Sequence, residues 1–245
     1  MPAMLLMLFS LALSIGTMTV LFIIHHVRQR RLAAPASASY EPVMFTVPVL
    51  SHASVRRPPS WLAIKSRNLR TVQSALGLHN PKPCSFLEGL AGEGKLFIAP
   101  PIQGWILVLG EGLPQPDDDV DICYRFLINI SRRLGEVQFY SANRITSNHA
   151  WVRLNRGRVV RAYAWAGKTL WHQGRKTASE EALSLRCLDY TEAAERSSLS
   201  EPDWIISNVE KVPLLAARWS LDPACIDERL LETELGIAGK PSRRY

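Results

Sequence analysis

The first 24 residues constrain this chain more than any other segment, because they contain no charged side chain. Apolar residues dominate the segment, and only small or weakly polar residues interrupt them. As a helix, such a segment rises about 36 Å at roughly 1.5 Å per residue, which is enough to cross a hydrocarbon core of about 30 Å. Residues 1–24 are therefore predicted to form one N-terminal transmembrane helix.

A cleaved signal peptide is the alternative interpretation of this segment. Signal peptides carry positive charge before the apolar run and small residues at a cleavage site directly after it. Here no cation precedes the run, and a basic cluster at 25–31 follows it. The Ala-rich stretch 33–38 resembles a cleavage site but lies beyond that cluster. We therefore favour an uncleaved anchor.

The basic cluster also predicts the orientation of the anchor, since Lys and Arg flanks stay on the cytoplasmic side. The N-terminus is expected outside and residues 25–245 in the cytosol. The four cysteines are far apart and show no Cys-x-x-Cys pairing, which is consistent with free thiols. Within the anchor, the small-x-x-x-small spacing of Ala12 and Gly16 could pair two helices, so a homodimer is one possible partner arrangement.

Positive charge is concentrated beside the anchor. Residues 25–82 hold nine Lys or Arg and one acid, whereas residues 83–245 are close to neutral. Proteins that bind nucleic acids usually carry their basic surface on the folded domain. No nucleic-acid partner is therefore expected, and anionic lipid is the predicted partner of residues 25–82.

Composition divides the remaining chain into three parts. Residues 25–60 form a basic, Pro/Ala-rich juxtamembrane tether, within which the apolar patch 43–50 could add an edge strand. Residues 61–235 are expected to form a single cytosolic domain. Residues 236–245 are short, basic and glycine-containing, and they are expected to be a flexible tail.

Within this domain, strands in the middle with hairpin connections and helices around them predict an α+β fold with a mostly antiparallel sheet flanked by helices. Ser60 resembles an N-cap for a helix at 61–77, whose basic face carries Arg67 and Arg70 and could either lie on lipid or face solvent. Residues 77–85 resemble turns. The other expected elements are strands at 96–99, 105–109, 137–140 and 169–172, and helices at 120–134, 177–185 and 222–234.

Residues 148–166 predict a β-hairpin around a three-residue loop at 156–158, in which Leu154 faces Val160. One face of this hairpin is apolar. The other face pairs His149 with Trp165, Trp151 with Tyr163 and Arg153 with Arg161.

These six residues, the aromatic–arginine face, are the candidate binding site. Two facing arginines repel each other unless an acid or a bound anion lies between them. Aromatic rings supply contact area, and guanidinium groups bind carboxylate or phosphate. The alternative is that a C-terminal helix covers the face and pairs the arginines with Glu180, Glu181 or Asp189.

The sequence contains no phosphate loop, dinucleotide fingerprint, zinc-type spacing or Gly-x-Ser-x-Gly elbow. The acids at 117–121 are explained as a helix start, so neither a metal nor another cofactor is expected. An enzyme acting on an anionic or membrane-derived substrate stays an alternative, with Arg153 and Arg161 as anion clamps and His149 as acid or base. No neighbouring residue activates Cys187 as a nucleophile.

Residues 161–167, Thr169, Trp171 and Gly174 resemble sequences of uncharacterised bacterial proteins, as do residues 104–108 and 219–223. This resemblance implies one α+β domain over roughly residues 60–232 and no assigned activity. Some small bacterial proteins of this kind are immunity proteins that bind toxins, which is a further alternative. The leading expectation is a membrane-anchored cytosolic binding module in the bacterial inner membrane.

Overall fold

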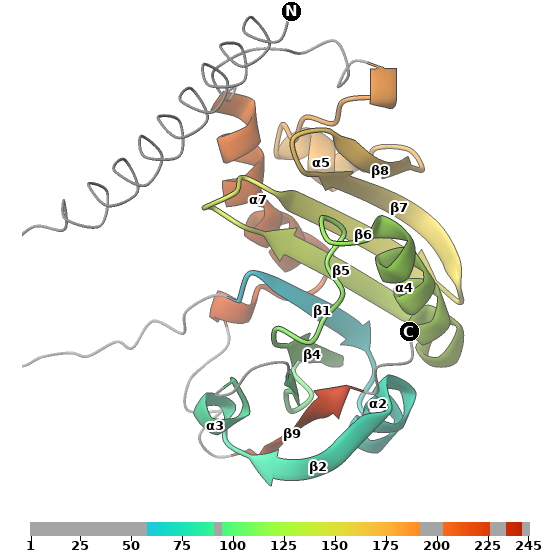
Figure 1. The fold of residues 1–245 in the computed structure, drawn as a ribbon, viewed down its shortest axis with the longest axis vertical. Coiled ribbons are helices and arrows are strands. Elements are labelled where there is room, and N and C mark those ends of the chain that lie inside the picture. Colours follow the sequence, from blue (N-terminus) through green and yellow to red (C-terminus); the bar gives the residue numbers. More distant parts are fainter. Residues whose placement is uncertain (1–57, 91–94, 192–202, 226–233, 242–245) are drawn as a thin grey trace, which may run out of the picture. The chain divides into compact units, whose positions relative to one another are not determined.

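The computed structural model describes residues 58–90, 95–191, 203–225 and 234–241. These residues form an α+β fold with a nine-stranded antiparallel sheet, as the sequence predicts, and helices pack on both of its faces (Figure 1). None of the helices in these four ranges is long and apolar enough to span a membrane. The predicted anchor at 1–24 and the apolar patch at 43–50 lie outside the described residues.

The sheet order is β2-β9-β3-β4-β1-β5-β6-β7-β8. The strands are β1 (Ser60–Lys65), β2 (Leu78–Cys84), β3 (Leu96–Ile98), β4 (Trp105–Leu109), β5 (Glu136–Ala142), β6 (His149–Asn155), β7 (Arg158–Trp165), β8 (Thr169–Gln173) and β9 (Gly236–Pro241). The helices are α2 (Leu69–Leu76), α3 (Phe86–Leu90), α4 (Val120–Leu134), α5 (Ala178–Ala182) and α7 (Asp203–Trp219), with a 3₁₀ turn at Pro223–Cys225.

The centre of the sheet has a split β-α-β arrangement. The elements β1, α2, β3, β4, α4 and β5 come in this order along the chain, with β2 and α3 inserted between α2 and β3, and their strands lie in the order β3-β4-β1-β5. This is the β-α-β-β-α-β order of ferredoxin-like folds. Strands β2 and β9 extend one edge, while the meander β6-β7-β8 extends the other. The topology by itself implies no function.

Two hydrophobic cores lie on opposite faces of the sheet. Helices α2 and α4 cover one core, and α3, α5 and α7 pack against the other (Figure 1). Strand β1 belongs to both cores, because Leu62 and Ile64 point to the first while Trp61 and Ala63 point to the second. A strand buried on both faces has a continuous apolar sequence rather than an alternating one.

The predicted helix at 61–77 is wrong for its first half. Residues 60–65 form the central strand β1, and a continuous apolar run of this length does not distinguish a buried strand from a helix. The helix begins later, where the Asn68 side chain accepts a hydrogen bond from the Thr71 N–H at 3.2 Å. It ends at Gly77, whose φ of 58° is left-handed.

Three expectations near the ends of the domain are also corrected. The predicted turns at 77–85 contain β2, an edge strand in which Pro81 and Pro83 discourage pairing with another chain. The predicted flexible tail contains β9, which lies between β2 and β3. Gly236 of β9 packs directly against the Phe97 ring, where a Cβ would not fit. The predicted helix at 222–234 is corrected only for its first turn, where Pro223–Cys225 form a 3₁₀ turn, and residues 226–233 lie outside the described residues.

The predicted hairpin is confirmed over most of its length. His149 faces Trp165, Trp151 faces Tyr163 and Arg153 faces Arg161. The prediction that Leu154 faces Val160 is wrong, because Leu154 pairs with Val159 and the register shifts there. The loop has two residues, Arg156 and Gly157, with φ values of 49° and 76°. Such a turn matches the twist of the strands, and the bulge takes up the extra residue.

Candidate functional site

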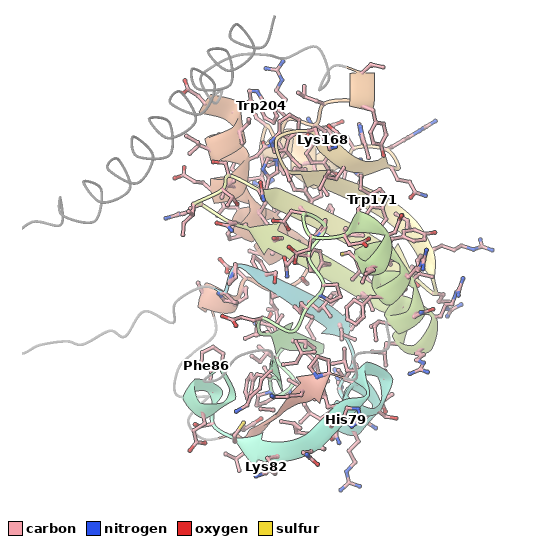
Figure 2. The ribbon with its side chains drawn as sticks, viewed as in Figure 1. His79, Lys82, Phe86, Lys168, Trp171 and Trp204 are labelled. Atoms are coloured by element: carbon pink, nitrogen blue, oxygen red, sulfur yellow. The ribbon has the colours of Figure 1, made fainter. Side chains whose placement is uncertain are left out.

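The aromatic–arginine face is covered rather than open. Side chains at four of its positions are at most 1% exposed, and Trp165 is 5% exposed. Helix α7 and residues 183–188 pack over it, and Trp204 of α7 contacts Trp165 with ring centroids 5.2 Å apart (Figure 2). Only the Arg153 side chain is substantially accessible, at 39%.

Arg161 is neutralised inside the domain by a carboxylate from α5. Its Nε lies 2.9 Å from Oε1 of Glu180, and neither side chain is more than 1% exposed. The same guanidinium donates to the carbonyl oxygens of Ala162, Gln173 and Gly174, and to the Cys187 sulfur. For Arg161, the pairing acid that the alternative interpretation requires is therefore present, and it is Glu180.

Glu180 is satisfied on both carboxylate oxygens. Trp151 Nε1 donates to Oε1 at 2.7 Å, and the Thr177 N–H and hydroxyl each donate to Oε2 at 2.8 Å. Thr177 and Glu180 form a capping box at the start of α5, as the sequence predicts for a helix beginning there. The network joins the strand face to α5.

Arg153 has a different partner from the acids named in the sequence analysis. Its Nη2 lies 3.1 Å from Glu136 Oε1, and Lys65 approaches the other oxygen of Glu136 at 3.4 Å. Each of the two facing arginines therefore pairs with its own acid, Arg153 with Glu136 and Arg161 with Glu180. No anion is needed between them.

His149 forms part of the core. Its Nδ1 lies 3.1 Å from the Ser147 carbonyl oxygen, and its Nε2 lies 3.2 Å from the Asn208 amide nitrogen of α7. Burial lowers the pKa of His149 to about 4, so its imidazole is neutral at physiological pH. With Nδ1 donating and Nε2 accepting, both ring nitrogens are satisfied.

Cys187 is held as a thiol. Burial raises its pKa to about 12, although the nearby Arg161 guanidinium opposes that shift. A nucleophilic cysteine requires the opposite change, towards a thiolate near neutral pH. His149 therefore lacks the acid–base role that the enzyme interpretation assigns to it, and Cys187 is not an activated nucleophile.

Comparisons with protein-family models, with curated proteins and with solved structures found no match.

The described surface carries a different collection of cations, which we call the arginine cluster. It comprises Arg70 of α2, Arg132 and Arg133 at the end of α4, and Arg156 and Arg158 at the β6–β7 turn. All five side chains belong to exposed residues. None of them makes a salt bridge to an acid in the four described ranges.

Backbone contacts hold the β6–β7 turn against the end of α4. The Arg156 N–H donates to the Gly135 carbonyl at 3.0 Å, and the Gly157 N–H donates to the Ser131 hydroxyl at 3.0 Å. Gly157 also lies directly against the side chain of Arg132. The arginines at the end of α4 and those at the β6–β7 turn are therefore neighbours, although they come from different parts of the sequence.

The sequence indicates that Arg70 belongs to a basic helix face, but it gives no sign of the cluster. Arg132 and Arg133 in the last turn of α4 resemble cations that stabilise the negative end of a helix dipole, and Arg156 and Arg158 resemble ordinary turn residues. Their proximity depends on how the hairpin packs on α4. No local pattern in the sequence encodes that contact.

Proposed function

We propose that this chain is a membrane-anchored binding module whose arginine cluster engages the anionic surface of the membrane. The proposal includes the predicted anchor at 1–24, a place in the bacterial inner membrane and a cytosolic domain. One observation carries it: five exposed arginines from three elements lie near one another, and none of them makes a salt bridge to an acid among the described residues. An anionic surface would supply that counter-charge.

The local electrostatics support an external anion. Like charges held close together raise the free energy of the folded state, and an opposing charge removes that repulsion. The α4 dipole favours cations at Arg132 and Arg133, but it falls off within the last helical turn. It therefore explains two members of the cluster better than the three that come from α2 and the β6–β7 turn.

The predicted tether supports the membrane as the anionic surface. A tether of the length of residues 25–60 keeps the domain within reach of its own bilayer, because even a fully extended Pro-rich chain of that length spans at most about 110 Å. Each Lys or Arg near an anionic leaflet contributes about 1 kcal/mol of attraction at physiological ionic strength. Five arginines would hold a tethered domain against such a leaflet.

The test uses the full-length chain reconstituted in nanodiscs that contain a dansyl-labelled lipid. Energy transfer from the domain tryptophans reports whether the domain lies on the bilayer. We expect higher transfer with 30% phosphatidylglycerol than with phosphatidylcholine alone, and we expect high salt to reduce it.

Paired charge reversals identify the surface responsible. Arg132→Glu with Arg156→Glu should reduce the equilibrium constant for docking at least thirtyfold, because two attractive contributions of about 1 kcal/mol are lost. Arg144→Glu with Lys168→Glu makes the same charge change at exposed turns outside the cluster (Lys168 is labelled in Figure 2). Equal effects of the two pairs, or no lipid dependence, would refute the proposal in favour of an acidic protein partner.

A further inference from the structure

We infer that the groove between α2 and α4 is a binding site for a phosphate ester. This inference rests on the proposed function, because it assigns a specific ligand chemistry to one part of the arginine cluster. The groove has a volume of about 530 Å³. Its lining consists of Arg70, Thr71, Ser74, Ala75, Arg133 and Leu134.

The polar lining of the groove consists of hydrogen-bond donors suited to an anion. Arg70 and Arg133 supply guanidinium groups from two different helices, while Thr71 and Ser74 supply hydroxyls. No carboxylate is among the described residues that line it. Guanidinium groups bind phosphate through two parallel hydrogen bonds, and hydroxyl donors can occupy the remaining oxygens.

The geometry of the two helices holds these donors in place. Arg133 Nη1 donates to the Ala75 carbonyl at 3.2 Å, which fixes the guanidinium across the end of α2. A guanidinium has five N–H donors, so this contact leaves others for a ligand. Arg70 and Ser74 are one helical turn apart and therefore lie on the same side of α2.

The groove is open to solvent rather than enclosed, and its volume of about 530 Å³ leaves room for an ester as well as for a bare ion. Ala75 and Leu134 add apolar surface beside the donors, which can contact the carbon chain of an ester. A lipid headgroup and a free phosphorylated metabolite share this chemistry.

The experiment titrates the full-length chain in neutral detergent with two probes, observed by calorimetry. The first is glycerol 3-phosphate, which is soluble, and the second is phosphatidylglycerol added to the micelles. Arg70→Gln with Arg133→Gln should weaken binding of the responding probe at least tenfold. Arg144→Gln with Lys168→Gln removes the same charge outside both the groove and the arginine cluster, and we expect it to weaken binding by less than threefold.

A second variant protects the test against misfolding, because Arg133 also contacts the α2 carbonyl. Thr71→Val with Ser74→Ala keeps every charge and removes only the hydroxyl donors. We expect three- to tenfold weaker binding with an unchanged unfolding transition. Response to glycerol 3-phosphate points to a free ester as the source, whereas response to phosphatidylglycerol alone points to a lipid headgroup.

Several results would overturn the inference. They are no binding of either probe, equal weakening by the groove pair and the control pair, and binding whose affinity the hydroxyl variant does not change. The same results leave the proposed function standing if the nanodisc measurement still shows cluster-dependent docking. Loss of nanodisc docking together with retained groove binding would reject the proposed function and keep the site.

Discussion

Glu180→Gln is the substitution that tests the closed aromatic–arginine face most sharply. Glu180 is fully buried and accepts hydrogen bonds from Trp151, Arg161 and Thr177. The amide keeps the size of the carboxylate but removes its charge. It also replaces one of the two accepting oxygens with an NH₂ group, which is a donor and then faces the donors that the oxygen bound. The Arg161 guanidinium is left buried without a counter-charge.

The expected cost can be estimated from that geometry. Breaking a buried ion pair by removing one partner costs about 3–5 kcal/mol. Arg161 keeps its three carbonyl acceptors, which places the expected loss near the lower end, at about 3 kcal/mol. Small domains have free energies of unfolding of about 5–15 kcal/mol, so the loss is a substantial fraction of the total.

The assay is urea unfolding of the full-length chain in detergent, followed by tryptophan fluorescence. Glu181→Gln is the matched control, since Glu181 is exposed on the same helix, and it should change the free energy of unfolding by at most about 0.5–1 kcal/mol. Adding Arg161→Met to Glu180→Gln should cost less than the sum of the two single changes. A Glu180→Gln variant as stable as the control would refute the buried network.

Three further predictions concern local structure. Gly157→Ala should lower the free energy of unfolding by about 1–2 kcal/mol, because its backbone is left-handed. In thermal unfolding it should cost more than Gly167→Ala, because Gly157 lies against a side chain and Gly167 does not, and equal costs would contradict the contact with Arg132. His149 binds its proton near pH 4 when folded and near pH 6.5 when unfolded, so the free energy of unfolding should fall by up to about 3 kcal/mol as pH drops between these values. His149→Gln should remove that component in urea titrations at pH 7, 5.5 and 4, and an unchanged pH dependence would argue against a buried neutral imidazole. Burial raises the pKa values of Cys123 and Cys187 to about 12, so iodoacetamide at pH 8 should label them in urea far faster than in the native protein, and fast native labelling would refute their burial.

Local signals in the sequence were sufficient to predict the elements that have clear start and end residues. Asp119 caps α4 by accepting from the Asp121 and Ile122 N–H groups, and Gly135 follows the last turn, as the pattern predicts. Strict alternation in the hairpin was sufficient to pair Arg153 with Arg161. Where alternation is absent, as in β1, the apolar run does not specify the secondary structure.

The other features that the sequence did not predict depend on tertiary contacts. Strand β9 contains two glycines and a proline, and it is a strand because β2 and β3 pair with it on both sides. Glu180 could be named as a partner for an arginine, but the sequence does not choose among Glu180, Glu181 and Asp189. The choice follows from the position of α5 over β6 and β7. The arginine cluster likewise depends on the packing of the hairpin against α4.

Hydrogen exchange of the full-length chain in nanodiscs tests the central claim most directly, because one measurement reports on both surfaces. Strands β6 and β7 beneath α5 and α7 should exchange slowly in every lipid. The end of α4 and the β6–β7 turn should gain protection only when phosphatidylglycerol is present, and salt should remove it. Lipid-dependent protection over residues 149–153 and 161–165, with none at the arginine cluster, would contradict the account.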